Sequence, residues 1–238
     1  MVVLNKKSAI SNFAFTLTLV LSVLNNSIYG EANFKGINMI GPYQVGHKDI
    51  YSSKDGVAVS VYYPMDRAEY ARTIRKRGRN TRWLRYDKKS LKGVSIAVAD
   101  IGARRHPPTC LFNYMKRIKM FTAQNGSLSK DFQGSDASVS LDHDSSSSFQ
   151  ALTNKKLIPV ILCHGLSGSR TSQSGSCRDM ASHGYIVFSL DHHDGSAYYS
   201  QKEDGQELFW SLDQDLQDIE LRKKQLLIRE NEVQNLID

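Results

Sequence analysis

The sequence predicts an α/β protein: a β-hairpin, then a strand–helix–strand unit with a mostly parallel sheet, then a long amphipathic C-terminal helix. Two short apolar runs, residues 157–163 and 185–190, flank a helical segment, as buried parallel strands do. Earlier in the chain, residues 57–63 alternate in polarity directly after an Asp-Gly turn, which is typical of a hairpin. At 238 residues the chain can form one substantial core.

The N-terminal residues 1–30 have the pattern of a signal peptide. Lys6 and Lys7 precede an apolar stretch at residues 13–24, and small residues follow. The apolar stretch is short for a bilayer-spanning helix. We therefore expect a secreted protein whose folded domain covers residues 31–238. An uncleaved N-terminus that anchors the chain in a membrane is the alternative.

The hairpin strand of residues 57–63 has a partner in Ile50 and Tyr51, and Pro64 ends it. A short helix is predicted at residues 111–120. Residues 122–154 are low in complexity, with four consecutive serines, and predict a disordered loop.

Basic residues are concentrated in one segment, residues 66–92. The whole chain has 31 Lys and Arg, 24 Asp and Glu, and a formal charge of +7, and this segment alone has eleven basic and three acidic residues. A solvated surface is one interpretation. The other is a contact with a lipid or lipoprotein surface, because basic groups attract anionic headgroups and Trp favours the interface. Its residues would be Arg72, Arg75, Lys76, Arg77, Arg79 and Trp83. A signal peptide argues against a nucleic-acid partner, although the composition also suits one.

No metal or redox motif is visible. No two of the three cysteines are spaced as C-x-x-C, which excludes the usual zinc and thioredoxin patterns. No D-x-D-x-D loop suggests a calcium site. Cys163 ends an apolar run, so we expect its side chain to be buried.

The strand–helix–strand unit places two loops together. A helix is expected at residues 171–183, with Gly184 as its C-terminal cap. Joined by this helix, the two strands should be parallel. Residues 191–195 (DHHDG) follow the second strand at its carboxyl end, where loops of such sheets usually carry function.

The last segment, residues 208–238, is predicted to be one amphipathic helix. Lys223 and Glu230 occupy two positions of its apolar stripe, which favours packing against the sheet over a coiled coil. The apolar members of the stripe are Leu212, Leu216, Ile219, Leu226, Val233 and Ile237.

Ser167 lies in the closest match to a nucleophile elbow, G-x-S-x-G. The match is imperfect, because Ser169 stands where the elbow needs a second glycine. In this class of fold an acid and a histidine follow the nucleophile on later strands, and little chain remains for them. A nucleophilic Ser167 stays open as the less favoured interpretation.

Three motifs, taken together and in this order, resemble the platelet-activating factor acetylhydrolases of the group-VII phospholipase A2 type. They are GPYQVG at residues 41–46, HGLSGSR at 164–170 and DMASHGYIVFSLDHHDGSA at 179–197. The resemblance implies the N-terminal half of an α/β-hydrolase fold. It also implies that Leu166 gives a backbone N–H to an oxyanion hole, that His164 orients the turn, and that Arg170 matches the family's arginine.

By the same resemblance, the Ser-Asp-His triad would lie beyond Asp238 and be absent from this chain. A truncated gene model, a splice product and a degenerate paralogue remain open. The implied activity is hydrolysis of the sn-2 acetyl or short oxidised acyl ester of a phospholipid, without a cofactor and independent of calcium. The chain alone would be inactive. The alternatives are a non-catalytic lipid-surface or protein-binding paralogue, or another esterase or lipase of the same fold.

Overall fold

The computed structural model describes residues 41–77, 81–82, 87–100, 107–117, 119–120, 122–132, 156–211 and 218–238. The predicted signal peptide therefore lies outside the described residues, as do Arg79 and Trp83 of the basic segment.

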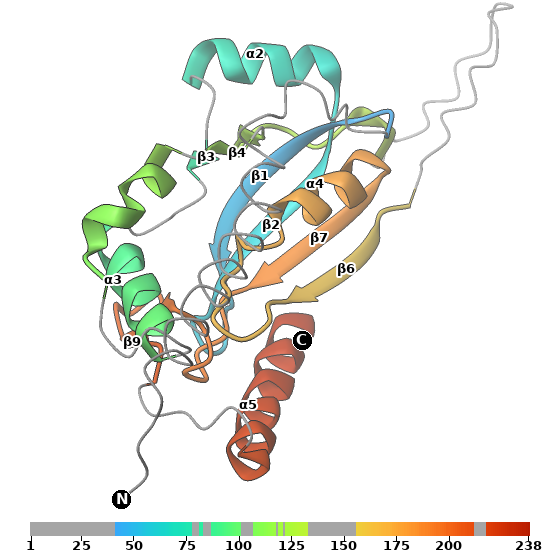
Figure 1. The fold of residues 1–238 in the computed structure, drawn as a ribbon. Helices are drawn as coiled ribbons and strands as arrows, with labels where there is room; N and C mark the ends of the chain where they lie inside the picture. The colour runs from blue at the N-terminus through green and yellow to red at the C-terminus, as the bar shows by residue number, and fades with distance from the viewer. Residues whose placement is uncertain are drawn as a thin grey trace, which may run out of the picture.

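A five-stranded mixed sheet forms the centre of the molecule, with the strand order β5-β1-β2-β7-β6 (Figure 1). The predicted hairpin is confirmed. Strand β1 (Gln44–Tyr51) pairs antiparallel with β2 (Ala58–Met65). Gly56 has a φ of 67° in the turn between them, a conformation that glycine adopts without strain.

The strand–helix–strand unit is also confirmed, and with it the α/β class. Strand β6 (Ile158–Cys163) runs parallel to β7 (Tyr185–Leu190), and helix α4 (Ser174–Ser182) connects them. Gly184 has a φ of 103° and donates its N–H to the carbonyl of Ala181, as a C-terminal cap does. Because β7 also pairs antiparallel with β2, the sheet is mixed.

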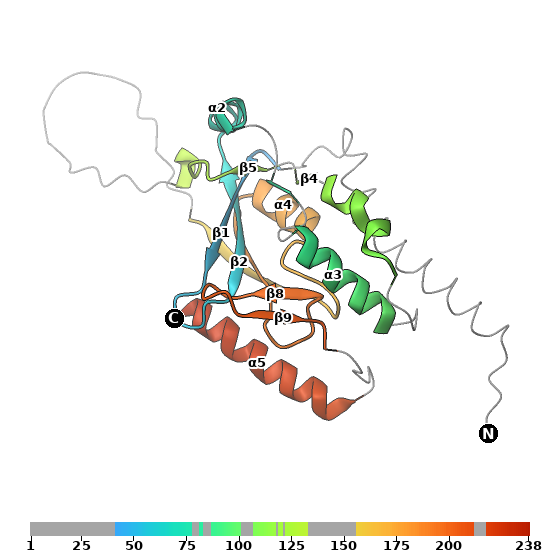
Figure 2. The same ribbon diagram turned by 90° about the vertical axis from the view of Figure 1, so that its left-hand side faces the viewer.

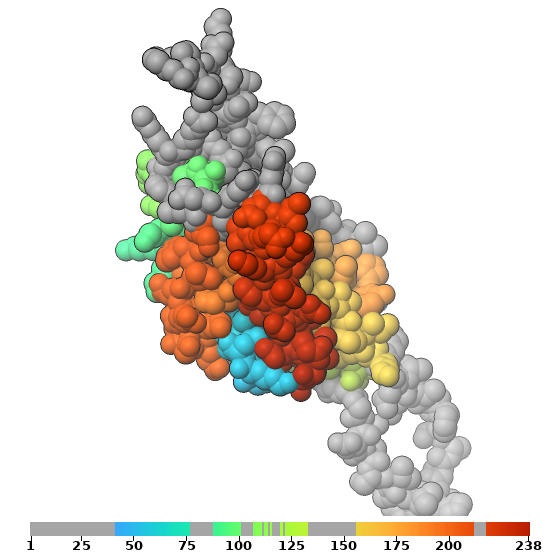
Figure 3. Space-filling view, turned by 90° about the horizontal axis from the view of Figure 1, so that it is seen from below, coloured from blue at the N-terminus to red at the C-terminus, as the bar shows by residue number. Residues whose placement is uncertain are grey.

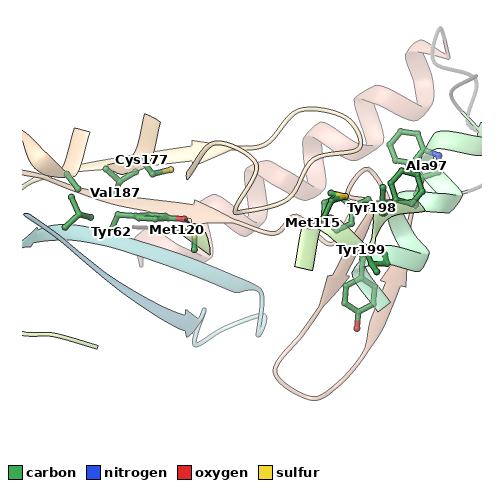
Figure 4. Close-up of a cluster of buried hydrophobic side chains, with 14 residues drawn as sticks. Tyr62, Ala97, Met115, Met120, Cys177, Val187, Tyr198 and Tyr199 are labelled. Atoms are coloured by element: carbon green, nitrogen blue, oxygen red, sulfur yellow. Dashed lines mark hydrogen bonds between the residues drawn. The ribbon is translucent and has the colours of Figure 1, made fainter. Parts of the chain in front are cut away.

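Helices cover both faces of this sheet (Figures 1 and 2). On one face α4 packs on the strands, and the core there includes Tyr62, Cys177 and Val187 (Figure 4). On the other face α5 (Ile219–Ile237), which Figure 3 shows on the surface of the molecule, packs its last turns against a second apolar cluster. That cluster contains Val59, Val61, Leu190, Val233 and Leu236. Full burial, as at Val59 and Leu190, contributes roughly 1.5–3 kcal/mol per side chain.

A further group of elements extends the first core beyond the sheet. It contains α3 (Asp87–Val98), a 3-10 helix η2 (Thr109–Arg117) and the small hairpin of β8 (Tyr199–Gln201) with β9 (Glu207–Phe209). Figure 4 shows their buried side chains side by side: Ala97, Met115, Tyr198 and Tyr199.

The basic segment begins with helix α2 (Arg67–Arg77), which stands apart from α5 in Figure 1. The predicted helix at residues 111–120 is instead the 3-10 helix η2 followed by the short strand β4 (Lys119–Met120). Strand β4 pairs with β3 (Thr81–Arg82), so residues 119 and 120 lie in a strand and not in the predicted helix.

The start of the 122–154 segment is ordered, which contradicts the prediction that the whole segment is a disordered loop. Strand β5 (Ala123–Gln124) pairs parallel with β1, and the 3-10 helix η3 (Lys130–Phe132) follows. Ser129 is fully buried, and its hydroxyl donates to Asp66. The low-complexity part, residues 133–155, lies outside the described residues.

The predicted C-terminal helix of residues 208–238 was too long, and its packed face was wrong. Residues at its expected start belong to β9, and α5 begins only after Asp218, whose carboxylate caps it by accepting from Leu221 N at 3.0 Å. Of the predicted stripe, Val233 packs on the sheet. Leu212 and Leu216 lie outside the described residues, and three members are exposed: Ile219, Leu226 and Ile237.

Strand β6 lies at the edge of the sheet among the described strands. Its outer side chains are exposed for this reason, with Ile158 at 56%. The prediction of a buried Cys163 was therefore wrong: its side chain is exposed at the carboxyl end of this edge strand. None of the helices described here is long and apolar enough to cross a membrane.

Candidate active site

Two loops meet at the carboxyl ends of the parallel strands. One follows β6 and contains the HGLSGSR motif, and the other follows β7 and contains residues 191–196. The register of β6 and β7 brings both strand ends to the same sheet edge, with Cys163 opposite Leu190. Such edges are the usual binding sites of α/β proteins.

The ring of His164 contacts its own loop through Nδ1 and the loop after β7 through Nε2. Nδ1 lies 2.8 Å from the carbonyl oxygen of Gly165, and Nε2 accepts the backbone N–H of His192 at 3.1 Å. Burial lowers the pKa of His164 to about 4, and the side chain is 2% exposed. Its ring is thus neutral and fixed, which suits an orienting residue rather than a base.

Leu166 occupies the exposed tip of the turn, with 43% of its surface accessible. Its neighbours direct their own N–H groups inward: Ser167 N donates to Ser196 O at 2.8 Å, and Gly168 N donates to Gly165 O at 3.1 Å. Among the described residues, the N–H of Leu166 has no acceptor. Its role as an oxyanion donor remains a prediction, and the N–H is free for it.

Ser167 has a φ of 54°, the left-handed conformation that few non-glycine residues adopt. Neither of the neighbouring glycines, Gly165 and Gly168, has a positive φ. Gly165 instead borders open space, since an added Cβ would meet nothing within 4 Å. In the described part of the chain Ser167 forms no hydrogen bond with an imidazole, so no base is in place for it.

Two serine–histidine pairs do occur elsewhere in the described residues. Ser200 Oγ lies 2.9 Å from Nδ1 of His193, and Ser182 Oγ lies 3.5 Å from Nδ1 of His183. Ser200 is 2% exposed and Ser182 is fully buried, so neither hydroxyl is open to a substrate.

Arg170 forms a buried ion pair with Asp191 that locks the two loops together. Both side chains are 4% exposed; Nη1 of Arg170 donates to Oδ2, and its backbone N–H donates to Oδ1 at 2.6 Å. Nε of Arg170 also donates to Ser60 on β2 at 3.1 Å. The residue that the family motif singled out is therefore an anchor beneath the turn. It lies away from the surface a substrate would reach.

Helix α5 supplies a second anchor. Arg229 donates through Nε to Oδ2 of Asp194 at 2.7 Å and through Nη1 to the carbonyl oxygen of His164 at 2.9 Å. Burial raises the pKa of Asp194, but hydrogen bonds from Ser196 and Arg229 outweigh it and hold that pKa below its ordinary value. Gln225 adds a hydrogen bond to the carbonyl oxygen of Asp194 at 3.2 Å.

The third α5 contact is a buried histidine–carboxylate pair. Nδ1 of His192 lies 2.7 Å from Oε2 of Glu232, and Oε1 of Glu232 accepts the N–H of His193 at 2.9 Å. His192 is fully buried and Glu232 is 5% exposed. The roles of Gln225, Arg229 and Glu232 were not predicted from the sequence. Their spacing of four and three residues was the available signal, since it predicts a polar stripe on one helix face.

In the described residues, no group of three or more His, Cys, Asp and Glu side chains is arranged to hold a metal ion. Hydrolysis without a cofactor or calcium remains a prediction. In the basic segment Arg72, Arg75 and Lys76 are exposed on α2, and Arg72 pairs with Glu69.

The fold and site define an α/β protein with a glycine-containing turn and three largely buried ion pairs at the carboxyl edge of its sheet: Arg170–Asp191, Arg229–Asp194 and His192–Glu232. Over residues 112–238, just over half of its length, the chain matches the family model of "Platelet-activating factor acetylhydrolase, isoform II". The chain belongs to this family.

Two similar proteins can be compared. Over 88 residues the chain is 34% identical to a protein of the dog, Canis lupus familiaris, named "Platelet-activating factor acetylhydrolase". That match covers 34% of this chain and 19% of the dog protein. A solved ferulic acid esterase from Streptomyces cinnamoneus superposes with a TM-score of 0.38 at 15% identity, covering 76% of this chain and 43% of that one. At this TM-score the superposition adds nothing to the fold assignment.

Proposed function

We propose that this chain carries the oxyanion-binding turn of an ester hydrolase that acts on glycerophospholipids with an acetyl or short oxidised acyl group at the sn-2 position. Family membership supports the reaction class. The single observation that carries the proposal is the N–H of Leu166, which has no acceptor among the described residues and lies at the exposed tip of a turn in which the next N–H groups, those of Ser167 and Gly168, are engaged.

The role of the turn follows from the chemistry of ester cleavage. Attack on the ester carbonyl moves negative charge onto its oxygen, and a fixed N–H close to that oxygen stabilises the transition state. One such donor contributes roughly 3 kcal/mol. The open space beside Gly165 leaves room for the carbonyl to approach the N–H of Leu166. Arg229 and His164 hold the turn in place from beneath.

We propose further that residues 1–238 alone do not turn over such an ester. The proposal is supported by the arrangement of serines in the described residues, where the hydroxyls paired with histidines are buried. Cleavage would need a serine nucleophile with an imidazole base, and the family resemblance expects these outside the present sequence. Independence from calcium is part of the same proposal.

The surface that would face lipid is proposed to be α2 and the residues after it. Support comes from the exposure of Arg72, Arg75 and Lys76 on this helix and from the attraction of basic groups to anionic headgroups. We propose with it that the N-terminal signal peptide directs export of the chain, so that this surface would meet extracellular lipids.

A chimera tests the proposal. Residues 157–196 would replace the corresponding segment of the dog protein, and release of acetate from platelet-activating factor would be measured. We expect the chimera to be active. Leu166→Pro, which removes the N–H, should lower kcat by about 10²–10³, and Leu166→Ala should not. A folded but inactive chimera, or equal rates for the two variants, would contradict the assignment. The 238-residue chain itself should show only background hydrolysis.

A further inference from the structure

An asparagine in the sequence pattern of a glycan acceptor lies on the surface directly after β5. Asn125, Gly126 and Ser127 form the pattern Asn-x-Ser, in which the middle residue is not proline. The side chains of Asn125 and Ser127 are exposed. In the sequence only Asn25 and Asn125 begin such a pattern, and Asn25 falls within the predicted signal peptide. Asn125 is therefore the acceptor that the domain would keep after removal of that peptide.

The turn at Asn125 is held in place through its backbone. The N–H of Asn125 donates to the carbonyl oxygen of His47 on β1 at 2.9 Å. The carbonyl oxygen of Gly126 accepts the hydroxyl of Tyr63 on β2 at 2.7 Å. By contrast, the side chains of Asn125 and Ser127 form no hydrogen bond with any of the described residues. A glycan on Asn125 would therefore displace no hydrogen bond that holds the fold.

Close packing fixes the middle of the turn against the protein. A Cβ added to Gly126 would lie 1.7 Å from Cε of Met65 on β2 and 3.3 Å from Oγ1 of Thr73 on α2. Shortly after the turn Ser129 is fully buried, and its N–H donates to the carbonyl oxygen of Pro64 at 2.9 Å. Because residues 126 and 129 are packed inward, the exposed side chains of residues 125 and 127 have a fixed place on the surface.

The backbone conformation accounts for Asn125 but not for Ser127. Asn125 has a φ of 54°, and asparagine is one of the few non-glycine residues that adopt this region readily. A turn alone would thus explain an asparagine followed by glycine. It does not explain the exposed hydroxyl of Ser127, which has no hydrogen-bond partner in the described part of the chain. A hydroxyl two residues after asparagine is what completes a glycan acceptor.

We propose that Asn125 is an N-glycosylation site, with an oligosaccharide on a polyprenyl diphosphate as the glycan donor. Nδ2 of Asn125 attacks the anomeric carbon of the oligosaccharide, so that an N–C bond forms and the bond from this carbon to the diphosphate oxygen breaks. The polyprenyl diphosphate leaves, and the amide gives up one proton to the transferase. The transfer rests on the export proposed above and is independent of the ester hydrolysis.

The glycan would lie away from the candidate active site. Among the described strands, β5 forms one edge of the five-stranded sheet and β6 forms the other. The HGLSGSR turn follows β6, whereas Asn125 follows β5. A glycan on Asn125 therefore leaves the approach to Leu166 open. It would instead shield the β5 edge, because a bulky, soluble group next to an edge strand hinders pairing with another chain.

The test expresses the full chain in cultured mammalian cells in two forms. One form keeps its own N-terminus, and in the other the leader of a secreted mammalian protein replaces residues 1–30. Peptide N-glycosidase in heavy-oxygen water converts a glycosylated asparagine into labelled aspartate, which mass spectrometry detects in the tryptic peptide of residues 120–130. We expect labelled aspartate at position 125 in both forms. A sample incubated without the enzyme controls for spontaneous deamidation of the Asn-Gly sequence.

Two variants of Ser127 provide a matched pair. Ser127→Ala should abolish the label, and Ser127→Thr should keep it, because threonine retains the hydroxyl. The side chain of residue 127 is exposed, so both variants should fold. Once removal of the replacement leader shows that the chain was exported, an unlabelled wild-type peptide would overturn the proposal, as would equal labelling of the two variants. A label only in the form with the replacement leader would support Asn125 as the acceptor and contradict export by the chain's own N-terminus.

Discussion

Nε of Arg229 donates to Oδ2 of Asp194 at 2.7 Å, and this contact attaches α5 to the loop after β7. The carboxylate of Asp194 is fully buried and the guanidinium is 16% exposed. Without Arg229 the charge of Asp194 would lack its ion-pair partner, and the carbonyl of His164 would lose a donor. The candidate turn therefore depends on a helix that begins more than fifty residues later in the chain.

Arg229→Met should be strongly destabilising. Removing one partner of a buried ion pair typically costs about 3–5 kcal/mol, because the remaining charge stays buried. The free energy of unfolding from urea titration measures this loss. Lys223→Gln on the same helix is the control: its pair with Glu220 is exposed, with both side chains above 60%, and should contribute less than about 1 kcal/mol. Similar losses in the two variants would argue against the anchoring role of Arg229.

Acid should destabilise the fold through His164. Its pKa in the folded state is lowered to about 4 by burial, against about 6.5 when unfolded. Between these values the unfolded chain binds the extra proton, so the free energy of unfolding falls as the pH drops from 6.5 to 4. The slope from one group is at most about 1.4 kcal/mol per pH unit. His164→Gln should flatten the wild-type slope between pH 6.5 and 4.5. An unchanged slope would show that His164 is not the group responsible.

Substitution of Ser167 should lower neither the free energy of unfolding nor the rate of ester hydrolysis. Its φ of 54° is strained for any residue with a side chain, so Ser167→Gly should raise the free energy of unfolding by about 0–1 kcal/mol. Ser167→Ala in the active chimera should leave ester hydrolysis unchanged. Loss of activity in that variant alone would make Ser167 the nucleophile and reverse the assignment of the turn.

The basic segment should bind anionic vesicles weakly. Neutralising Arg75, Lys76, Arg77 and Arg79 together should abolish co-sedimentation with phosphatidylserine vesicles. Binding of the wild-type chain should also weaken as salt rises, since exposed charges are screened beyond about 8 Å at physiological ionic strength. Neutral phosphatidylcholine vesicles are the control. If the neutralised variant still binds, the segment is a solvated surface with no part in lipid contact.

The edge strand β6 should promote self-association of the isolated chain. Its exposed residues offer an apolar edge, with Ile158 at 56% exposure, and such edges pair with other chains. Ile158→Lys should lower the aggregate fraction in light scattering, with a stability change of about 0.5 kcal/mol or less. Ile219→Lys, at an equally exposed site on α5, is the control and should change association less. A monomeric wild-type chain would contradict this expectation.

Local pattern was enough to predict the central elements. The alternation in residues 57–63, the apolar runs of β6 and β7 and the cap at Gly184 each depend on neighbours in sequence, and each is confirmed. The motif HGLSGSR also located the turn and singled out Arg170. Its buried partner Asp191 follows the other parallel strand, so only the pairing of β6 with β7 brings the two charges together.

The tertiary structure decided which side chains are buried at the sheet edge and which face of α5 packs, and the apolar pattern could predict neither. Cys163 ends an apolar run, yet it is exposed because β6 lies at the sheet edge. Helix α5 turns Gln225, Arg229 and Glu232 towards the sheet, although its apolar residues predicted a face centred one residue further along. The reason is physical: the strand-end loops present a buried carboxylate, an imidazole and free carbonyl groups, and burying these requires hydrogen-bonding partners more than it requires apolar contact. Sequence by itself determined the hairpin of β1 and β2 and the strands β6 and β7, while the choice of helix face depended on which polar groups the folded sheet left to be satisfied.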